Sequence, residues 1–306
     1  MDAAITCKAL TKRYGTVLAL DSLSLEVPRN VVFGFLGPNG AGKTTTMRIL
    51  AGLSAPTSGA AYLDGCLASP HDPASRRRVG YLPEEPSFYG WMSAREYLLF
   101  VGGLLGLAGR EAAKRADELL ELVDLREVAK RRIAGFSRGM RQRLGIAQAL
   151  VGRPEVLLLD EPSSALDPLG RRDVLALIER LAGQTTVFIS THILADVERV
   201  CQQVAIVAHG RLMAQADQEA LRQRYATPIF EIETAAEAPE LVERLRAEPW
   251  VERIDREATV LRLTVRDEQR ARRELPQLIA GLGEQLVRYQ QARPTIEDVF
   301  VRLVEA

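Results

Sequence analysis

A glycine-rich stretch near the N-terminus has the residue types and the spacing to bind phosphate. "GPNGAGKT", from Gly37 to Thr44, fits the pattern G-x-x-x-x-G-K-[ST], in which backbone N–H groups approach phosphate oxygens. Lys43 offers an ammonium group to the β- and γ-phosphates, and the Thr44 hydroxyl is a ligand for Mg²⁺. The residues expected to contact a nucleotide here are Gly37, Pro38, Asn39, Gly40, Ala41, Gly42, Lys43, Thr44 and Thr45.

A second candidate for phosphate chemistry is an apolar run that ends in acid. "VLLLDE" places Asp160 and Glu161 directly after a strand pattern that begins at Val156. Phosphoryl transfer needs a group that holds the metal and a group that orients the attacking water. We expect Asp160 to hold Mg²⁺ through water and Glu161 to act as the general base.

The stretch "AGFSRGMRQRLGIAQAL", residues 134–150, leaves three interpretations open. Its arginines could bind nucleic acid, they could form a solvated helix face, or Ser137 and Gly139 could be half of a ligand site. The chain carries 40 basic and 40 acidic residues, for a formal net charge of zero. A nucleic-acid-binding domain is usually basic, so this balance argues against the first interpretation.

These residues must be positioned by regular elements, and short β-branched runs alternate with helical patterns as far as Met213. Expected strands are 5–10, 18–27, 31–36, 79–82, 156–160, 185–190 and 204–207. Expected helices are 42–51, 94–105, 111–123, 139–151, 169–181 and 193–201. Continuous apolar strands such as "VLLL" and "VFIS" are typical of a parallel sheet buried on both faces, so the fold class is α/β. Residues 89–152 form a helical subdomain inserted into it.

The pattern changes in the last third of the chain. Residues 228–306 give the order βαββαβ, typical of a small ferredoxin-like α+β domain, without a recognisable catalytic constellation. A final helix begins near Thr295 and Asp298, which have the spacing of a capping box. We therefore predict a nucleotide-binding domain over 1–213, a linker over 214–227 and an accessory domain over 228–306.

Five motifs together give a resemblance to a known family. "GPNGAGKT", "FSRGM", "LLLDE", "SALD" and "STH" occur in the order and approximate spacing of the ATP-binding cassette (ABC) family, over the first two thirds of the chain. The resemblance implies a P-loop NTPase fold and ATP as the nucleotide. In that family two cassettes meet head to tail around two ATP molecules, and the "FSRGM" motif of each faces the phosphate loop of the other.

The resemblance also implies roles for individual residues. Tyr14 matches the aromatic residue that stacks on adenine, and His192 matches the histidine that contacts the γ-phosphate. Ser137 and Gly139 match residues that reach the second cassette's ATP. The loop Ser164-Ala165-Leu166-Asp167 matches the segment that joins the two sites, with Asp167 near the nucleotide.

Two positions depart from the family pattern. Glu84 stands where the family usually has a glutamine that senses the γ-phosphate and the metal, and its carboxylate could orient water or Mg²⁺. Met140 replaces the glutamine of the family's signature motif and cannot form its hydrogen bonds. His71 and His209 lie in turn-like contexts and are expected on the surface.

The function that the resemblance implies is that of the ATPase subunit of an exporter, a homodimer docked on separately encoded membrane-spanning subunits at the cytoplasmic face of the cell membrane. The aromatic cluster Phe88, Tyr89 and Trp91 fits a docking surface and fits a core equally well. The longest apolar run, 97–109, is too short to span a bilayer. We expect no nucleic-acid partner.

Two alternatives remain open at this point. One is a soluble ATPase that clamps nucleic acid or the ribosome, although such proteins usually carry two cassettes or long coiled coils. The other is a nucleotide-binding regulator without turnover, which the intact Glu161 argues against. Cys7, Cys66 and Cys201 lie far apart and outside any metal-ligand spacing, so we interpret them as reduced thiols of a cytosolic protein.

Overall fold

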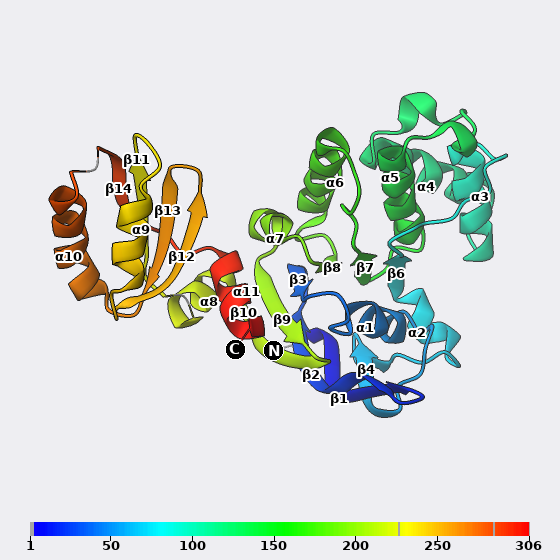
Figure 1. Cartoon of the computed structure of the whole chain (residues 1–306). Helices are drawn as coiled ribbons and strands as arrows, with labels where there is room; N and C mark the ends of the chain where they lie inside the picture. The colour runs from blue at the N-terminus through cyan, green and yellow to red at the C-terminus, as the bar shows by residue number, and fades with distance from the viewer. Residues whose placement is uncertain (1–2, 226, 284, 306) are drawn as a thin grey trace. The chain divides into compact units, whose positions relative to one another are not determined.

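A computed structural model describes residues 3–225, 227–283 and 285–305. The chain folds as two compact units, Met1–Gln218 and Glu219–Ala306, which are described separately (Figure 1). Among the described residues, no helix combines the length and the apolar character that crossing a membrane requires.

The first unit is built on a six-stranded sheet in the order β10-β9-β3-β8-β7-β6. Its strands are β3 (Val32–Leu36), β6 (Val79–Leu82), β7 (Val156–Asp160), β8 (Thr186–Thr191), β9 (Gln203–Ala208) and β10 (Arg211–Asp217). All neighbours pair in parallel except β9 and β10, which form an antiparallel edge. Every residue of β3, β7 and β8 is buried, which explains their continuous apolar sequences. The predicted α/β class is confirmed.

A second, antiparallel sheet in the first unit has the order β2-β1-β4-β5. Its strands are β1 (Ala3–Tyr14), β2 (Val17–Pro28), β4 (Ser58–Leu63) and β5 (Cys66–Leu67). The first two strands were predicted, but they belong to this second sheet and not to the parallel one. Strands β4 and β5 were not predicted. The sequence of β4, "SGAAYL", has weak β propensity, and β4 forms because β1 offers it a partner.

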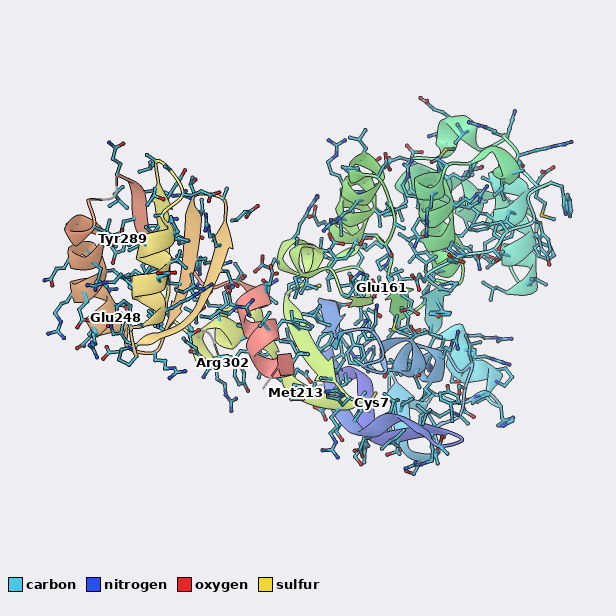
Figure 2. The ribbon with its side chains drawn as sticks, in the orientation of Figure 1. Cys7, Glu161, Met213, Glu248, Tyr289 and Arg302 are labelled. Carbon is cyan, nitrogen blue, oxygen red and sulfur yellow. The ribbon has the colours of Figure 1, made fainter. Side chains whose placement is uncertain are left out.

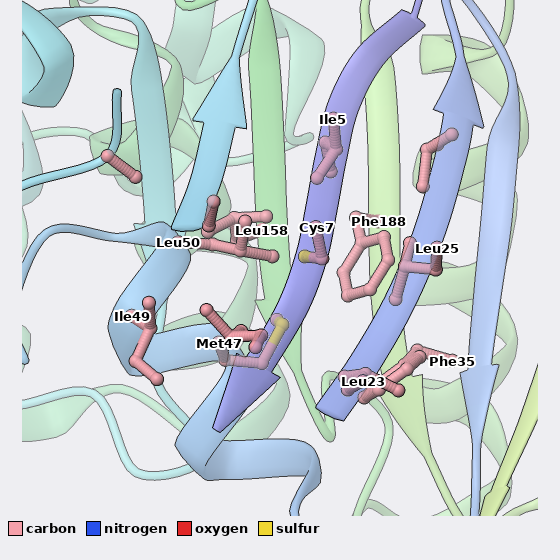
Figure 3. Packing of buried hydrophobic residues seen from close by; sticks show 14 of the residues in the cluster. Ile5, Cys7, Leu23, Leu25, Phe35, Met47, Ile49, Leu50, Leu158 and Phe188 are labelled. Carbon is pink, nitrogen blue, oxygen red and sulfur yellow. The ribbon is translucent and has the colours of Figure 1, made fainter. Parts of the chain in front are cut away.

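Helix α1 (Lys43–Leu50) packs into the core that joins the two sheets. Its buried face carries Met47, Ile49 and Leu50, in the same cluster as Cys7 of β1 and Phe188 of β8 (Figure 3). Because these side chains leave almost no exposed surface, the start of α1 is held firmly where β3 ends.

The first unit's remaining helices include those of the inserted segment. They are α2 (Pro73–Arg77), α3 (Ala94–Leu104), α4 (Gly109–Leu122), α5 (Arg138–Leu150), α6 (Pro168–Leu181) and α7 (Leu194–Val200), with short 3-10 turns at Arg126–Val128 and Ile133–Gly135. Within 89–152 neither sheet has a strand, as predicted, and α3, α4 and α5 cluster together in Figure 1. Helix α3 begins with a capping box between Ser93 and Glu96.

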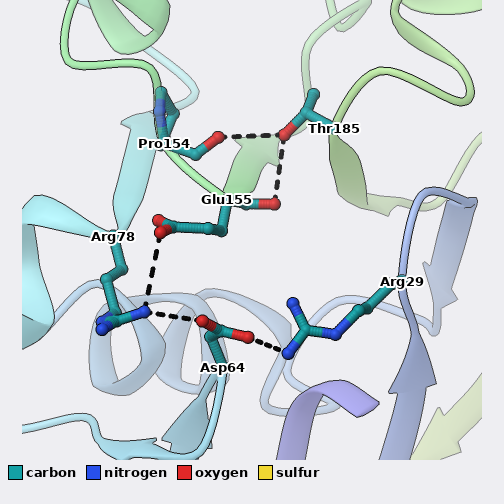
Figure 4. A network of polar contacts seen from close by, with 6 residues as sticks. All are labelled: Arg29, Asp64, Arg78, Pro154, Glu155 and Thr185. Atoms are coloured by element: carbon teal, nitrogen blue, oxygen red, sulfur yellow. Dashed lines mark hydrogen bonds and ion pairs between the residues drawn. The ribbon is translucent and has the colours of Figure 1, made fainter. Parts of the chain in front are cut away.

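A polar network connects the two sheets at the end opposite the strand C-termini (Figure 4). Asp64, in the turn after β4, pairs with Arg29 and, at 2.6 Å, with Arg78. Arg78 also lies 3.5 Å from Glu155, next to β7, and the Thr185 hydroxyl donates to the Glu155 carbonyl at 3.1 Å. These contacts join the turn after β4 to the segments that precede β3, β6, β7 and β8.

The second unit has the predicted βαββαβ order followed by a helix. Its elements are β11 (Ile229–Thr234), α9 (Pro239–Arg246), β12 (Val251–Glu257), β13 (Val260–Val265), α10 (Glu268–Gly281), β14 (Leu286–Ala292) and α11 (Ile296–Glu305). The sheet order β12-β13-β11-β14, all antiparallel, is that of a ferredoxin-like fold. Phe230, Leu263 and Trp250 are in its core, and Thr295 and Asp298 form the predicted capping box. Residue 306 lies outside the described residues.

The two units divide after Gln218, inside the predicted linker over 214–227, but this segment has regular secondary structure, which was not predicted. Residues 211–217 form β10, which extends the central sheet, and α8 (Gln218–Tyr225) follows at once. The amide of Gln218 donates to the carbonyls of Val197 at 3.0 Å and Cys201 at 2.6 Å, so it closes the end of α7. The polar composition of this segment concealed a sheet edge and a short helix. Residue 226 lies outside the described residues.

Candidate functional site

The glycine-rich loop curves between the end of β3 and the start of α1. Gly42 has a φ of 98°, and a Cβ at this position would lie 2.6 Å from the Ala19 carbonyl oxygen, so only glycine fits. Lys43 is 7% exposed and donates to the carbonyl oxygens of Gly37 at 2.8 Å and Pro38 at 3.3 Å. The loop therefore wraps around its own ammonium group.

The first turn of α1 is suited to an anion. The first N–H groups of a helix have no partner inside the helix, and the helix dipole places partial positive charge there. No acidic residue lies in this turn, and Lys43 adds a full positive charge. Both features favour a phosphate group at this end of α1.

Two neighbouring parallel strands bring the acids and a histidine to the same loop. Asp160 ends β7 opposite Ser190 of β8, and the N–H of Glu161 donates to the Ser190 carbonyl at 2.8 Å. Glu161 Oε2 lies 2.9 Å from His192 Nδ1, and Oε1 lies 3.6 Å from Lys43 Nζ. In Figure 2, Glu161 is labelled close to these strand ends. The Glu161 carboxylate, the His192 ring and the Lys43 ammonium group therefore lie side by side.

Asp160 is a buried carboxylate with an unused oxygen. It is 2% exposed, and its Oδ1 makes no hydrogen bond among the described residues. Burial raises the pKa of Asp160; hydroxyls of Ser190 and Thr44 oppose that rise, and the negative charges of Glu161 and Glu84 add to it. A carboxylate and a hydroxyl are oxygen donors of the kind that Mg²⁺ takes, so Asp160 and Thr44 fit this cation.

Tyr81 of β6 is a neighbour of Asp160 that the sequence analysis missed. Burial, the charge of Asp160 and a hydrogen bond to it raise the pKa of Tyr81 to about 12, although Arg48 acts in the opposite direction. No motif includes this tyrosine; its place in the parallel strand next to β7 is the signal that could have found it.

A pocket of about 430 Å³ collects most of the predicted nucleotide-binding residues. Its lining is Tyr14, Val17, Leu18, Ala19, Pro38, Asn39, Gly40, Gly42, Lys43, Thr44, Thr45, Glu84, Glu161 and His192. Gly37, Ala41 and Asp160 are buried and do not line it. The pocket has an apolar end, formed by the hairpin between β1 and β2, and a charged end. These ends suit the base and the phosphates of a nucleoside triphosphate.

The apolar end of the pocket comes from the β1–β2 hairpin. Tyr14 is 46% exposed and pairs with Val17 across a two-residue turn. Lys12 Nζ lies 4.9 Å from the centre of the Tyr14 ring and donates to the Ala55 carbonyl at 2.6 Å. Sequence reasoning missed Val17, Leu18 and Ala19, although the hairpin signal "YGTV" places them beside Tyr14.

Ser137, Gly139 and Asp167 are not part of this pocket. Ser137 caps α5 by accepting from the Met140 N–H at 3.2 Å, and Asp167 caps α6 by accepting from the Gly170 N–H at 3.2 Å. A Cβ on Gly139 would lie 3.5 Å from the Gly170 Cα, so the two helix starts adjoin. The three residues form a second cluster in the first unit.

The arginines of α5 bond mainly to the chain itself. Arg143 donates to the carbonyls of Val123 at 3.1 Å and Asp124 at 3.3 Å, and Arg141 lies within 3.4 Å of the Ala134 carbonyl. These bonds close neighbouring turns, so the nucleic-acid interpretation loses its main support. His71 and His209 are exposed, as expected.

The aromatic cluster after Glu84 is divided between core and surface. Phe88 is half-buried and packs edge-on against Tyr97, with ring centres 5.2 Å apart. Tyr89 is 52% exposed and Trp91 is 68% exposed, and Tyr89 also contacts Phe100 at 5.7 Å. The surface interpretation therefore holds for Tyr89 and Trp91.

Two protein families match this chain. Residues 20–164 match the ABC transporter family, and residues 217–304 match the ATP-binding protein DrrA1-3-like C-terminal domain. The first match includes the glycine-rich loop and the acids after β7, and the second covers nearly all of the second unit.

Curated relatives match most or nearly all of the chain. The uncharacterized ABC transporter ATP-binding protein YxlF of Bacillus subtilis is 39% identical, over 99% of this chain and all of its own length. The Nod factor export ATP-binding protein I of Cupriavidus metallidurans is 34% identical, over 99% and 98%. The bacitracin transport ATP-binding protein BcrA of Bacillus licheniformis is 41% identical, over 73% of each chain.

Solved structures agree with the sequence relatives. A dimeric post-hydrolysis state of the ATP-binding cassette MJ0796, bound to ADP and Pi, is 25% identical, with a TM-score of 0.62 over 70% of this chain and 98% of that one. With the geometry of the pocket, these likenesses show that the chain belongs to the ABC transporter family, as an ATP-binding, ATP-hydrolysing subunit with a DrrA1-3-like C-terminal domain.

Proposed function

We propose that this chain drives an exporter at the cytoplasmic face of the cell membrane, where two copies close around two ATP molecules and act on separate membrane-spanning permease subunits. Relatives named for bacitracin transport and for Nod factor export support a transport role. The main support for ATP hydrolysis at this site is that Glu161 contacts both Lys43 and His192 and that all three line one pocket.

Each group at the charged end of the pocket has a distinct role in hydrolysis. Lys43 and the first turn of α1 bind the β- and γ-phosphates and balance their charge. Glu161 accepts a proton from the attacking water at a carboxylate oxygen. His192, bonded to Glu161 through Nδ1 and 48% exposed, holds that carboxylate and reaches toward the γ-phosphate.

Magnesium has a matching set of oxygen donors in this site. Thr44 and Asp160 would hold the ion, with Glu84 beside them, and bound Mg²⁺ would stabilise negative charge on the phosphates. The buried, unpartnered Oδ1 of Asp160 supports this assignment, because a cation offsets the desolvation that raises the pKa of that carboxyl.

The second cluster supports the two-copy arrangement. Ser137, Gly139 and Asp167 lie at the adjoining starts of α5 and α6, outside the pocket that holds Lys43. A helix start is an anion site, so this cluster suits the phosphates of ATP bound to a second copy. The dimeric MJ0796 structure is consistent with such an assembly.

The exposed aromatic face next to Glu84 is the proposed permease contact. Trp91, Tyr89 and Phe100 lie together with Leu104, which is 72% exposed, on the helical insert. Exposed aromatic clusters of this kind mark protein interfaces. The interpretation as a nucleic-acid clamp has no support from the overall charge, because the chain carries no net positive charge.

The test of the catalytic assignment is Glu161→Gln. The variant should bind ATP but hydrolyse it at least ~10²-fold more slowly, because the general base is gone. The matched control is Glu155→Gln, which removes only a partly exposed ion pair at the other end of β7 and should leave turnover unchanged. Turnover of Glu161→Gln at the wild-type rate would reject Glu161 as the base.

A further inference from the structure

A buried acid outside the nucleotide pocket joins the loops that carry the catalytic groups. Asp196, on α7, is 3% exposed and uses both carboxylate oxygens. Oδ2 accepts a hydrogen bond from the hydroxyl of Ser163, itself 3% exposed. Oδ1 lies 2.7 Å from both Nε and Nη2 of Arg171, on α6.

The three partners come from three segments next to the site. Ser163 lies two residues after Glu161, and Asp196 lies four residues after His192. Arg171 lies in the first turn of α6, four residues after the helix cap Asp167. The Asp196 carboxylate therefore connects three segments: the loop that carries Glu161, helix α7 after His192, and the start of α6.

The loop that Asp196 holds has an unfavourable backbone. Glu161 has a φ of 48° and Ala165 a φ of 51°, a left-handed conformation that is unfavourable for a residue other than glycine. Such conformations persist only where the surroundings fix them. Backbone bonds from Glu161 to Ser190 and from Ser164 to Glu161 fix one end of the loop, and the Ser163–Asp196 bond fixes its middle.

Global stability alone does not account for a charged group at this position. A buried ion pair gives up hydration, and replacing it with apolar residues is often neutral or stabilising. A charged hydrogen bond instead selects one geometry. That geometry is needed here, since the 2.9 Å contact between Glu161 and His192 depends on how two loops meet.

We propose that Asp196 is a positioning residue for ATP hydrolysis: through Ser163 and Arg171 it holds the loop 161–167 so that Glu161 faces the nucleotide beside His192. The proposal rests on the catalytic assignment above. It predicts that loss of Asp196 impairs turnover more than ATP binding, because Lys43 and the glycine-rich loop are not part of the cluster.

Asp196→Asn in the full chain should lower kcat about 10- to 100-fold, the cost of misplacing a catalytic group, with KM for ATP within about twofold. Ser163→Ala should have the same effect and Ser163→Thr, which keeps the hydroxyl, should not. The double variant Ser163→Ala with Asp196→Asn should be about as slow as Asp196→Asn alone, because both substitutions act through the same three-residue cluster.

The matched control is Glu179→Gln, which breaks another ion pair between the same two helices, Glu179 with Arg199 at 2.8 Å. Rates are divided by the amount of nucleotide bound, so that unfolded protein does not lower the measured kcat. Equal kcat losses in Asp196→Asn and Glu179→Gln, or a wild-type kcat in Ser163→Ala, would overturn the proposal. Wild-type turnover of Glu161→Gln would instead show that Glu161 is not the general base. That result concerns the proposed function and is distinct from the results for Asp196 and Ser163.

Discussion

Lys43 contacts carbonyl oxygens of its own loop and a carboxylate from the loop that follows β7. Its ammonium donates to the carbonyl oxygens of Gly37 and Pro38 and lies 3.6 Å from the Glu161 carboxylate. A triphosphate that binds Lys43 therefore competes with Glu161 for one positive charge.

Tyr14 gives a prediction at the scale of one side chain. Tyr14→Ala should raise KM for ATP about 5- to 100-fold, the range expected for loss of one base–aromatic stacking contact, and leave kcat almost unchanged. Tyr14→Phe keeps the ring and should behave as wild type. Steady-state ATPase kinetics give both constants, and equal KM values for the alanine and phenylalanine variants would show that the ring does not contact adenine.

At the scale of elements, three helix starts organise the chemistry. Helix α1 begins in the glycine-rich loop, α5 begins at Ser137 and α6 begins at Asp167. The α1 start lies at the pocket, and the other two adjoin one another outside it. This division predicts different effects for substitutions at the two places: changes at Lys43 should weaken ATP binding, and changes at Ser137 should weaken assembly of two copies.

Ser137→Arg tests that division. The variant should bind ATP as a single copy but should neither dimerise with ATP nor hydrolyse it, because a bulky side chain would enter the space of the second copy's phosphates. Loss of the helix cap alone costs about 1 kcal/mol. The control Asp267→Arg also removes a cap, at the start of α10 in the second unit, and should dimerise normally. Size-exclusion chromatography with and without ATP measures dimer formation by both variants. If Ser137→Arg forms normal dimers, residues 134–150 are only a basic helix face.

At the scale of the whole molecule, the nucleotide pocket and the proposed docking face lie on different parts of the first unit. The nucleotide pocket contains Lys43 and Glu161, while Tyr89 and Trp91 lie exposed on the helical insert. Glu84 lines the pocket and precedes this aromatic face by only a few residues. A short chain segment thus leads from the charged end of the pocket to the proposed permease contact.

Trp91→Ser should separate these two functions. Its basal ATPase rate should equal that of wild type, while its binding to membranes that contain the permease should fall, because an exposed aromatic anchor is lost. Leu53→Ser removes another large exposed apolar side chain, 60% exposed, and should bind those membranes normally. Sedimentation of the purified variants with such membranes makes the comparison. Full binding of Trp91→Ser would place the permease contact elsewhere.

The sequence predicted the elements well where the pattern was local and strong. The buried strands β3, β7 and β8 and the helices of the insert follow directly from apolar runs and helical spacing. Among the elements that were not predicted, β4, β10 and α8 have short or polar sequences. They form because a neighbouring strand or helix end offers hydrogen-bond partners, and such pairing is not visible in a local window.

The sequence by itself determined the chemistry available: a lysine in a glycine-rich turn, two acids after a strand and a histidine after another, each at a spacing that local backbone geometry sets. Only the tertiary structure decided which of these meet. Glu161 and His192 lie in contact because β7 and β8 are parallel neighbours whose carboxyl ends share one edge of the sheet. The Ser163–Asp196–Arg171 cluster belongs to no motif, since burial brings its three segments together.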